Sequence, residues 1–125
     1  MYAEPSPYTV PHYALPGLTT NAGVTVLGPT RFAAAEPIAA ACHDWAAALS
    51  SARIVVDGSG PETPPGAALL IGAACATGRP VAAYLPRSTY THAAGREPNH
   101  RNLMVQYGVE ATLRSADEVT TWISG

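Results

Sequence analysis

The sequence predicts a small α/β domain, with a doubly wound (flavodoxin- or Rossmann-like) parallel sheet of four or five strands. Short apolar runs alternate with helical segments along the chain, which is the pattern of a parallel sheet covered on both faces. The runs are continuously apolar rather than alternating, as expected for strands buried from both sides. A length of 125 residues allows one domain and leaves no room for a second.

Residues 1–22 differ in composition from the rest of the chain. They hold four prolines and three tyrosines and show no strand or helix period. We therefore predict an extended arm over 1–22 and the α/β domain over 23–125, with a first strand at Val24–Leu27 that Gly28 and Pro29 end.

The remaining elements follow from local signals. Pro37 suits the first turn of an Ala-rich helix, Gly78 suits the end of a small-residue helix, and Ser115 with Glu118 forms a capping box. The predicted strands are 54–56, 81–85 and 111–113, and the predicted helices are 38–49, 67–77, 102–109 and a last one that opens at 115–118. The segments 58–66 and 86–101 are predicted loops.

Composition narrows the possible partners. The net charge is −2 and lysine is absent, so the chain has no electrostatic signature for nucleic acid or an anionic membrane. No apolar run approaches the length of a transmembrane helix, and no secretory signal is visible. Cys42 and Cys75 have no metal-ligand spacing and are expected to be buried free thiols in a cytoplasmic protein. With only 13% charged residues, the surface is expected to be covered in part by another subunit of a homo-oligomer.

The segment from Pro64 to Val81 carries a family resemblance. Its strand–loop–helix setting, with Gly66-Ala67-Ala68-Leu69-Leu70-Ile71-Gly72 followed by Gly78-Arg79-Pro80-Val81, resembles the nucleoside 2-deoxyribosyltransferase family. Asn102-Leu103-Met104 and Asp44 match two further elements, so the likeness covers roughly residues 38–123. The resemblance implies a doubly wound domain that acts on nucleosides and completes its sites across subunits.

Two departures from the family concern its chemistry. Leu70 occupies the position of the nucleophilic glutamate, and Pro64 occupies that of an aspartate. A leucine there is expected to be a core residue. The segment Val24–Phe32 fits either the first or the second strand of the family, and we favour the second, which leaves the first strand–helix unit missing.

Three carboxylates are candidates for catalysis. Exchange of a base needs a carboxylate that attacks the anomeric carbon and an acid for the departing base. Glu62 lies on a loop after a strand and is either a substitute nucleophile or a solvated side chain. Asp57 ends the same strand and either binds the substrate or forms an Asx-turn. The resemblance places Asp44 near the base, and the alternative is a surface acid.

Three further residues are candidates for substrate binding. The resemblance places Asn102 in the sugar pocket, although it also suits a helix N-cap. Gly66 matches the family's glycine at the start of the helix. Arg87 belongs to a loop rich in Arg and His that suits a phosphate.

These features predict a protein that binds a nucleoside or nucleotide, with altered or impaired cleavage or transfer at the N-glycosidic bond. The alternative is a non-catalytic binding protein or the inactive partner of a catalytic paralogue. No cofactor and no metal are expected.

Overall fold

The computed structural model describes residues 1–5, 27–30, 35–60, 62–86 and 102–125. Its elements, in chain order, are β1 (Tyr2–Glu4), α1 (Pro37–Ser50), β2 (Ile54–Asp57), α2 (Pro65–Thr77), β3 (Val81–Tyr84), α3 (Leu103–Gly108), β4 (Ala111–Leu113) and α4 (Ala116–Ser124). The four strands form one all-parallel sheet in the order β1-β2-β3-β4. The predicted α/β fold is therefore confirmed.

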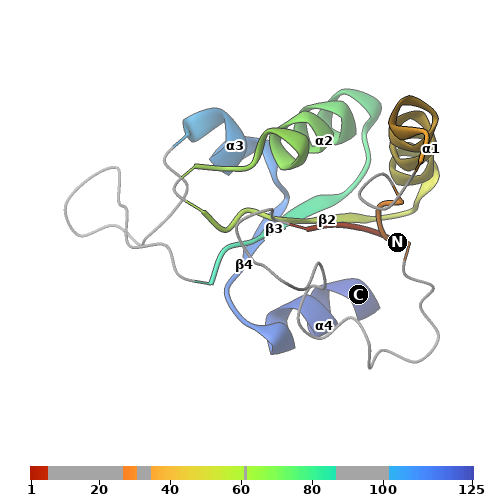
Figure 1. Cartoon of the computed structure of the whole chain (residues 1–125). Coiled ribbons are helices and arrows are strands. Elements are labelled where there is room, and N and C mark those ends of the chain that lie inside the picture. Colours follow the sequence, from red (N-terminus) through yellow and green to blue (C-terminus); the bar gives the residue numbers. More distant parts are fainter. Residues whose placement is uncertain (6–26, 31–34, 61, 87–101) are drawn as a thin grey trace.

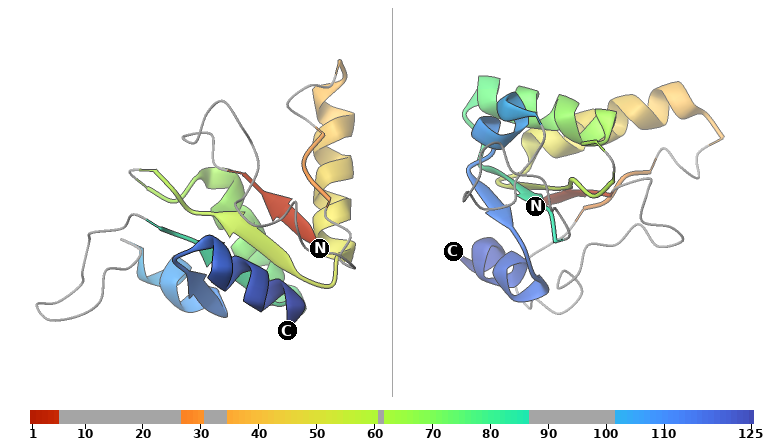
Figure 2. Two further views of the ribbon diagram at one scale, coloured as in Figure 1. Left: turned by 90° about the horizontal axis from the view of Figure 1, so that it is seen from below. Right: turned by 90° about the vertical axis from the view of Figure 1, so that its left-hand side faces the viewer.

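Helices cover both faces of this sheet. α1, α2 and α3 lie on one face and α4 lies on the other (Figures 1 and 2). One buried cluster fills the space under the three helices, and its residues include Tyr2, Ile54, Leu70 and Val81. A second cluster, which includes Val55 and Val119, fills the space above α4. Alternate residues of each strand thus enter opposite layers, as the pleat requires.

The helix ends follow their sequence signals. Pro37 begins α1, and Gly78 ends α2 in the left-handed conformation with φ of 70°. Asn102 caps α3, and the Ser115 hydroxyl accepts the Glu118 N–H at 3.2 Å to cap α4. The second hydrogen bond of the capping box differs from the usual one, because the Glu118 carboxylate accepts the N–H of Arg114 rather than that of Ser115.

The beginning of the predicted arm is a strand of the sheet, so the prediction is wrong there. Tyr2–Glu4 form a strand inside the sheet, paired in parallel with Ile54–Val56. Only three residues take part, and the strand is stabilised by its neighbours on both sides rather than by its own composition. Residues 6–22 of the predicted arm lie outside the described residues.

Leu27 shows where the next segment joins the sheet. It forms a parallel bridge with Tyr2, exchanging backbone bonds of 2.9 Å with Met1 and Ala3. Because β2 occupies the other edge of β1, Leu27 lies on the opposite side, and residues 24–26 lie outside the described residues. A strand, β1, therefore precedes Leu27 in the chain, whereas the second placement of Val24–Phe32 left the first strand–helix unit missing.

This arrangement reverses the direction of strand addition at β1. The chain leaves β1 for the edge at Leu27 and then continues to β2 on the other side. A reversal of this kind is a topological switch point, and ligands of open α/β sheets bind outside the carboxyl ends of the strands beside it. The fold therefore directs attention to the carboxyl end of β1.

The two cysteines differ from expectation. Both are free, as predicted, but both are exposed rather than buried. Cys42 lies on the outer side of α1, and the Cys75 thiol contacts the carbonyl of Gly108 at 3.3 Å. The Ala-rich helices bury alanines against the sheet and leave the larger sulfur side chains outside.

Candidate functional site

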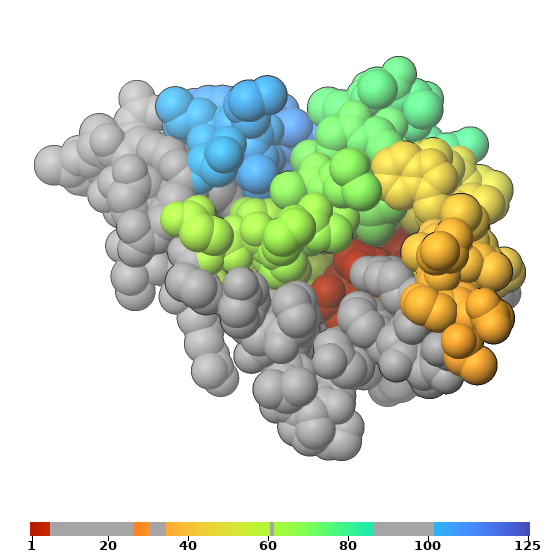
Figure 3. Space-filling model, turned by 45° about the horizontal axis from the view of Figure 1, so that its top comes forward, coloured from red at the N-terminus to blue at the C-terminus, as the bar shows by residue number. Residues whose placement is uncertain are grey.

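A cavity opens between α1 and α2, above the carboxyl end of β1. Its volume is about 150 Å³, and it is lined by Tyr2, Glu4, Ala41, Asp44, Trp45, Gly66, Leu69 and Leu70. In the space-filling view, atoms of β1 (red) are visible at the bottom of a hollow between α1 (orange to yellow) and α2 (green) (Figure 3). The cavity thus lies where the strand reversal at β1 predicts a ligand site.

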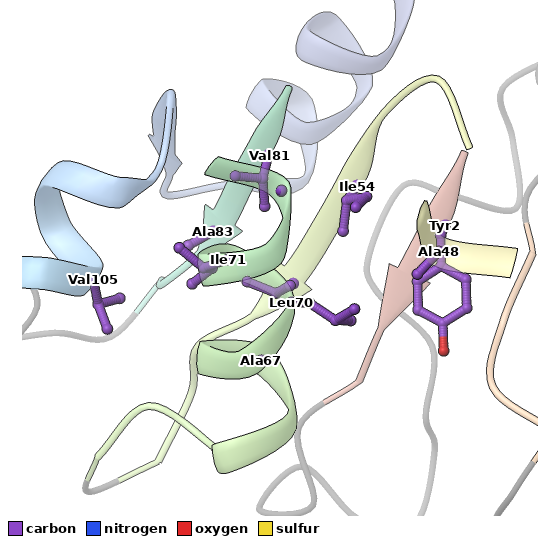
Figure 4. Packing of buried hydrophobic residues seen from close by; sticks show 11 residues of the cluster. Tyr2, Ala48, Ile54, Ala67, Leu70, Ile71, Val81, Ala83 and Val105 are labelled. Carbon is purple, nitrogen blue, oxygen red and sulfur yellow. The ribbon is translucent and has the colours of Figure 1, made fainter. Parts of the chain in front are cut away.

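Tyr2 and Glu4 form a buried pair at the base of this cavity. They are two residues apart on β1, so their side chains share one face of the sheet. The Tyr2 hydroxyl donates to Oε2 of Glu4 at 3.0 Å, and the two residues are 1% and 2% exposed. Figure 4 shows Tyr2 on the same side of the sheet as Leu70. A carboxylate so removed from bulk water is costly unless it is hydrogen-bonded, and Tyr2 supplies one such bond.

Asp44 extends into the cavity from α1. It is 3% exposed, so the alternative of a surface acid is wrong. Its Oδ1 accepts hydrogen bonds from the backbone N–H and the hydroxyl of Thr30, both at 2.7 Å. The carboxylate therefore joins α1 to the segment that follows Leu27, and it forms part of the cavity wall at the same time.

The rim of the cavity is apolar. Trp45 on α1 is 38% exposed and Leu69 on α2 is 61% exposed, and both belong to the lining. The cavity therefore combines buried oxygen atoms at its base with an exposed aromatic ring and an aliphatic side chain at its mouth.

Leu70 is a core residue, as expected. It is 5% exposed and packs in the cluster beneath the helices. It also forms part of the cavity lining. The position that the resemblance assigns to a nucleophile thus presents a hydrocarbon surface to the cavity.

The other two candidate carboxylates lie elsewhere. Asp57 is buried, and its Oδ1 accepts the N–H of Ser59 at 2.9 Å, which is the Asx-turn named above as its alternative. Glu62 is exposed on the loop before α2. Neither belongs to the described lining of the cavity. The structure thus brings Asp44 and Gly66 together and leaves Asp57 and Glu62 apart from them.

The candidates for substrate binding divide in the same way. Gly66 lies in the first turn of α2 and lines the cavity. Asn102 is exposed, and its Oδ1 caps α3 by accepting the N–H groups of Met104 at 2.9 Å and Val105 at 3.3 Å. Arg87 lies outside the described residues, as does the loop rich in Arg and His around it.

Sequence reasoning missed Tyr2 and Glu4. A usable signal is present, because a tyrosine and a glutamate at i and i+2 share a face in any strand. The strand itself was hidden by its length of three residues and by the prolines that follow it.

No protein-family model matches this chain, and no curated protein matches it. The fold is that of a small Rossmann-like α/β protein, and a cavity lies at the carboxyl end of its strand β1. In the described part of the chain, no three His, Cys, Asp or Glu side chains gather as a metal site would require. The same part contains no helix of the length and hydropathy needed to cross a membrane.

Proposed function

We propose that this cavity binds a nucleoside or nucleotide and that the protein acts on the N-glycosidic bond by a route altered from that of the deoxyribosyltransferases. The observation that carries the proposal is the combination of buried oxygen atoms at the base with an aromatic rim at a topological switch point. The motif resemblance from Gly66 to Val81 and at Asn102–Met104 supports the choice of ligand class.

The layout of the cavity suggests how such a ligand lies. Cavities of about 150 Å³ hold one ring of roughly the size of benzene, so one ring of a nucleoside enters and the other remains at the mouth. The carboxylates of Glu4 and Asp44 suit the hydroxyl groups of a sugar, which are hydrogen-bond donors. The indole of Trp45 and the side chain of Leu69 suit the flat face of a base.

Leu70 favours one alternative function. Without a carboxylate at that position, the family's covalent step has no acceptor there, so a non-catalytic nucleoside-binding protein, or the inactive partner of a catalytic paralogue, is the second candidate. The two candidates share the ligand and differ in the release of free base.

The first test is a thermal-shift panel of nucleosides, deoxynucleosides and their monophosphates, followed by chromatography of the same mixtures. A ligand at about a hundred times its dissociation constant adds about 2.7 kcal/mol to the free energy of unfolding, which a melting curve detects. Stabilisation with release of free base supports the enzyme. Stabilisation without release supports the binding protein.

A pair of variants on one helix makes this test specific. Trp45→Ala removes the aromatic side of the rim, whereas Ile38→Ala truncates a side chain of α1 that is 82% exposed and outside the described lining. We expect the first to lose the ligand-induced shift and the second to keep it. If no compound shifts the wild-type melting temperature, the proposed ligand class is wrong.

We further propose a homo-oligomer that forms through the layer of α1, α2 and α3. The single Asp, Glu, Lys or Arg in these three helices is the buried Asp44. Their exposed large apolar side chains are Ile38, Trp45, Leu69, Leu103, Met104 and Tyr107. Because these three helices carry no exposed Asp, Glu, Lys or Arg, two copies of them meet without like-charge repulsion, which suits an isologous contact.

The mass of the protein in solution tests this contact. Light scattering after size-exclusion chromatography should give a multiple of 12.9 kDa, and Met104→Asp should reduce it because it introduces two buried charges per dimer. A monomeric wild-type protein at high concentration would contradict the proposal. A cytoplasmic location fits the free thiols of Cys42 and Cys75, and cell fractionation tests it.

A further inference from the structure

We infer that Glu4 is the nucleophile of this site, a carboxylate supplied by β1 in place of the one that α2 lacks at Leu70. This inference rests on the proposed function and names the residue that would perform its chemical step. It begins from the fact that Glu4 and Leu70 line the same cavity, one from the strand below and the other from the helix above. The cavity therefore retains a carboxylate although the helix position has none.

The surroundings of Glu4 suit a nucleophile. The Tyr2 hydroxyl holds Oε2 at 3.0 Å, and the strand register of Glu4 with Val56 fixes the backbone that carries it. The residue is 2% exposed yet belongs to the cavity lining, so a sugar that enters meets a carboxylate with little bulk water around it. A preorganised group with few water molecules to displace attacks at a lower cost than a solvated one.

The other candidate carboxylates differ from Glu4 in their position: Asp44 connects two segments of the chain, and Asp57 and Glu62 lie outside the described lining. Oδ1 of Asp44 accepts both hydrogen bonds from Thr30, and any movement of the Asp44 side chain toward a ligand breaks them. Asp57 caps its own turn at Ser59, and Glu62 is exposed on a loop. Of the acidic residues that the structure describes, Glu4 and Asp44 are the two in the cavity lining, and Glu4 is the one at the strand end.

The chemical step balances with the substrate and water alone. A carboxylate oxygen of Glu4 forms a bond to the anomeric carbon as the bond from that carbon to the base nitrogen breaks. The bonding pair leaves with the base, which takes a proton from solvent. Water, or a second base in a transfer reaction, then attacks the same carbon and releases a proton to solvent, and the pair of the ester bond returns to Glu4. Tyr2 positions the carboxylate throughout and is not itself bonded to the sugar.

Trapping of the glycosyl ester tests the assignment on the wild-type protein. A nucleoside with fluorine at C2′ in the arabino configuration is the probe, because fluorine destabilises the cationic transition state through which the ester breaks down. Trypsin then separates the candidates. Peptide 1–31 contains Glu4 as its only carboxyl side chain, 32–53 contains Asp44 with Glu36, and 54–87 contains Asp57 with Glu62.

A sugar-mass increase on peptide 1–31 is the expected result. The same increase on 32–53 or 54–87 overturns the assignment and gives the role to another carboxylate. Stabilisation by nucleosides without any adduct, whether or not base is released, overturns the covalent step while the proposed ligand site stands. Absence of stabilisation by every nucleoside removes the proposed function together with the inference.

Three variants complete the design. Glu4→Gln keeps an acceptor for Tyr2 and should retain the nucleoside-induced thermal shift while losing the adduct and base release. Tyr2→Phe removes the hydroxyl alone, and we expect kcat to fall more than tenfold with KM within about threefold of wild type. Glu62→Gln is the matched control on an exposed loop, and it should form the adduct at the wild-type rate.

Discussion

The Asp44 carboxylate holds Thr30 at two atoms, through hydrogen bonds of 2.7 Å from its backbone N–H and its hydroxyl. This contact links α1 to the segment that begins at Leu27, where the chain pairs with the outer edge of β1. One side chain thus connects the helix on one side of the cavity with the strand edge beside it. The family resemblance predicted a binding role for Asp44, and the structure adds a structural one.

Replacement of Asp44 should therefore lower stability. Asp44→Ala leaves the donors of Thr30 without their acceptor, and we expect the free energy of unfolding in urea to fall by about 1–3 kcal/mol. Asp44→Asn keeps an acceptor oxygen and should lose less. Glu110→Gln, at an exposed position, is the control and should change stability by less than about 0.5 kcal/mol. Equal losses in Asp44→Ala and the control would contradict a role for the Thr30 bonds.

Two adjacent leucines of α2 should respond differently to truncation. Leu70 is 5% exposed and Leu69 is 61% exposed, so only the first leaves a cavity in the core. In the monomer, Leu70→Ala should cost about 2–5 kcal/mol in the free energy of unfolding, and Leu69→Ala less than about 0.5 kcal/mol. Urea denaturation compares them. A large loss in Leu69→Ala would mean that its side chain is covered in the assembly.

Two helical glycines provide an opposite pair. A Cβ built on Gly72 meets nothing within 4 Å, whereas one on Gly108 lies 3.0 Å from Cγ2 of Ile71, a side chain that is 3% exposed. Gly72→Ala should raise the free energy of unfolding by about 0.5–1 kcal/mol, because alanine loses less backbone entropy in a helix. Gly108→Ala should lower it by about 1 kcal/mol through overpacking. Thermal denaturation should place the wild type between the two variants.

Arg53 joins the start of β2 to α4. Its guanidinium donates to the carbonyl of Trp122 at 2.6 Å and lies 4.9 Å from the centroid of the same indole. Arg53→Met should cost about 1–2 kcal/mol, and Arg53→Lys should cost less because the charge remains without the planar group. In a Trp45→Phe background, Trp122 is the only tryptophan, so its emission reports the loss directly. Unchanged emission in Arg53→Met would rule out the ring contact in solution.

Much of the fold follows from local patterns in the sequence. The apolar runs at 54–56, 81–85 and 111–113 predicted three of the four strands, because a strand buried on both faces needs a continuous run. This pattern did not predict β1, because Tyr-Ala-Glu is not a continuous apolar run and is too short to show an alternation of apolar and polar residues. It is a strand because Leu27 and Ile54–Val56 flank it, and pairing between distant segments leaves no local signal.

The site residues that the sequence predicted correctly are those on elements with a clear local signal. Asp44 and Gly66 lie on helices that the sequence indicates clearly, and both line the cavity. Tyr2 and Glu4 depend on the unrecognised strand and were missed with it. Asp57 and Glu62 were candidates because one ends β2 and the other follows it, but Asp57 accepts the N–H of Ser59, Glu62 is exposed, and neither belongs to the described lining of the cavity.

The position of β1 also bears on the order in which the molecule folds. Its partner Ile54 lies 52 positions after Tyr2, whereas β2 and β3 are joined through α2 by a much shorter connection. Closing the longer loop costs more chain entropy, so the unit β2-α2-β3 can form first and present an edge on which β1 docks late. The base of the cavity is then among the last parts to assemble, and it is lost early whenever that edge opens.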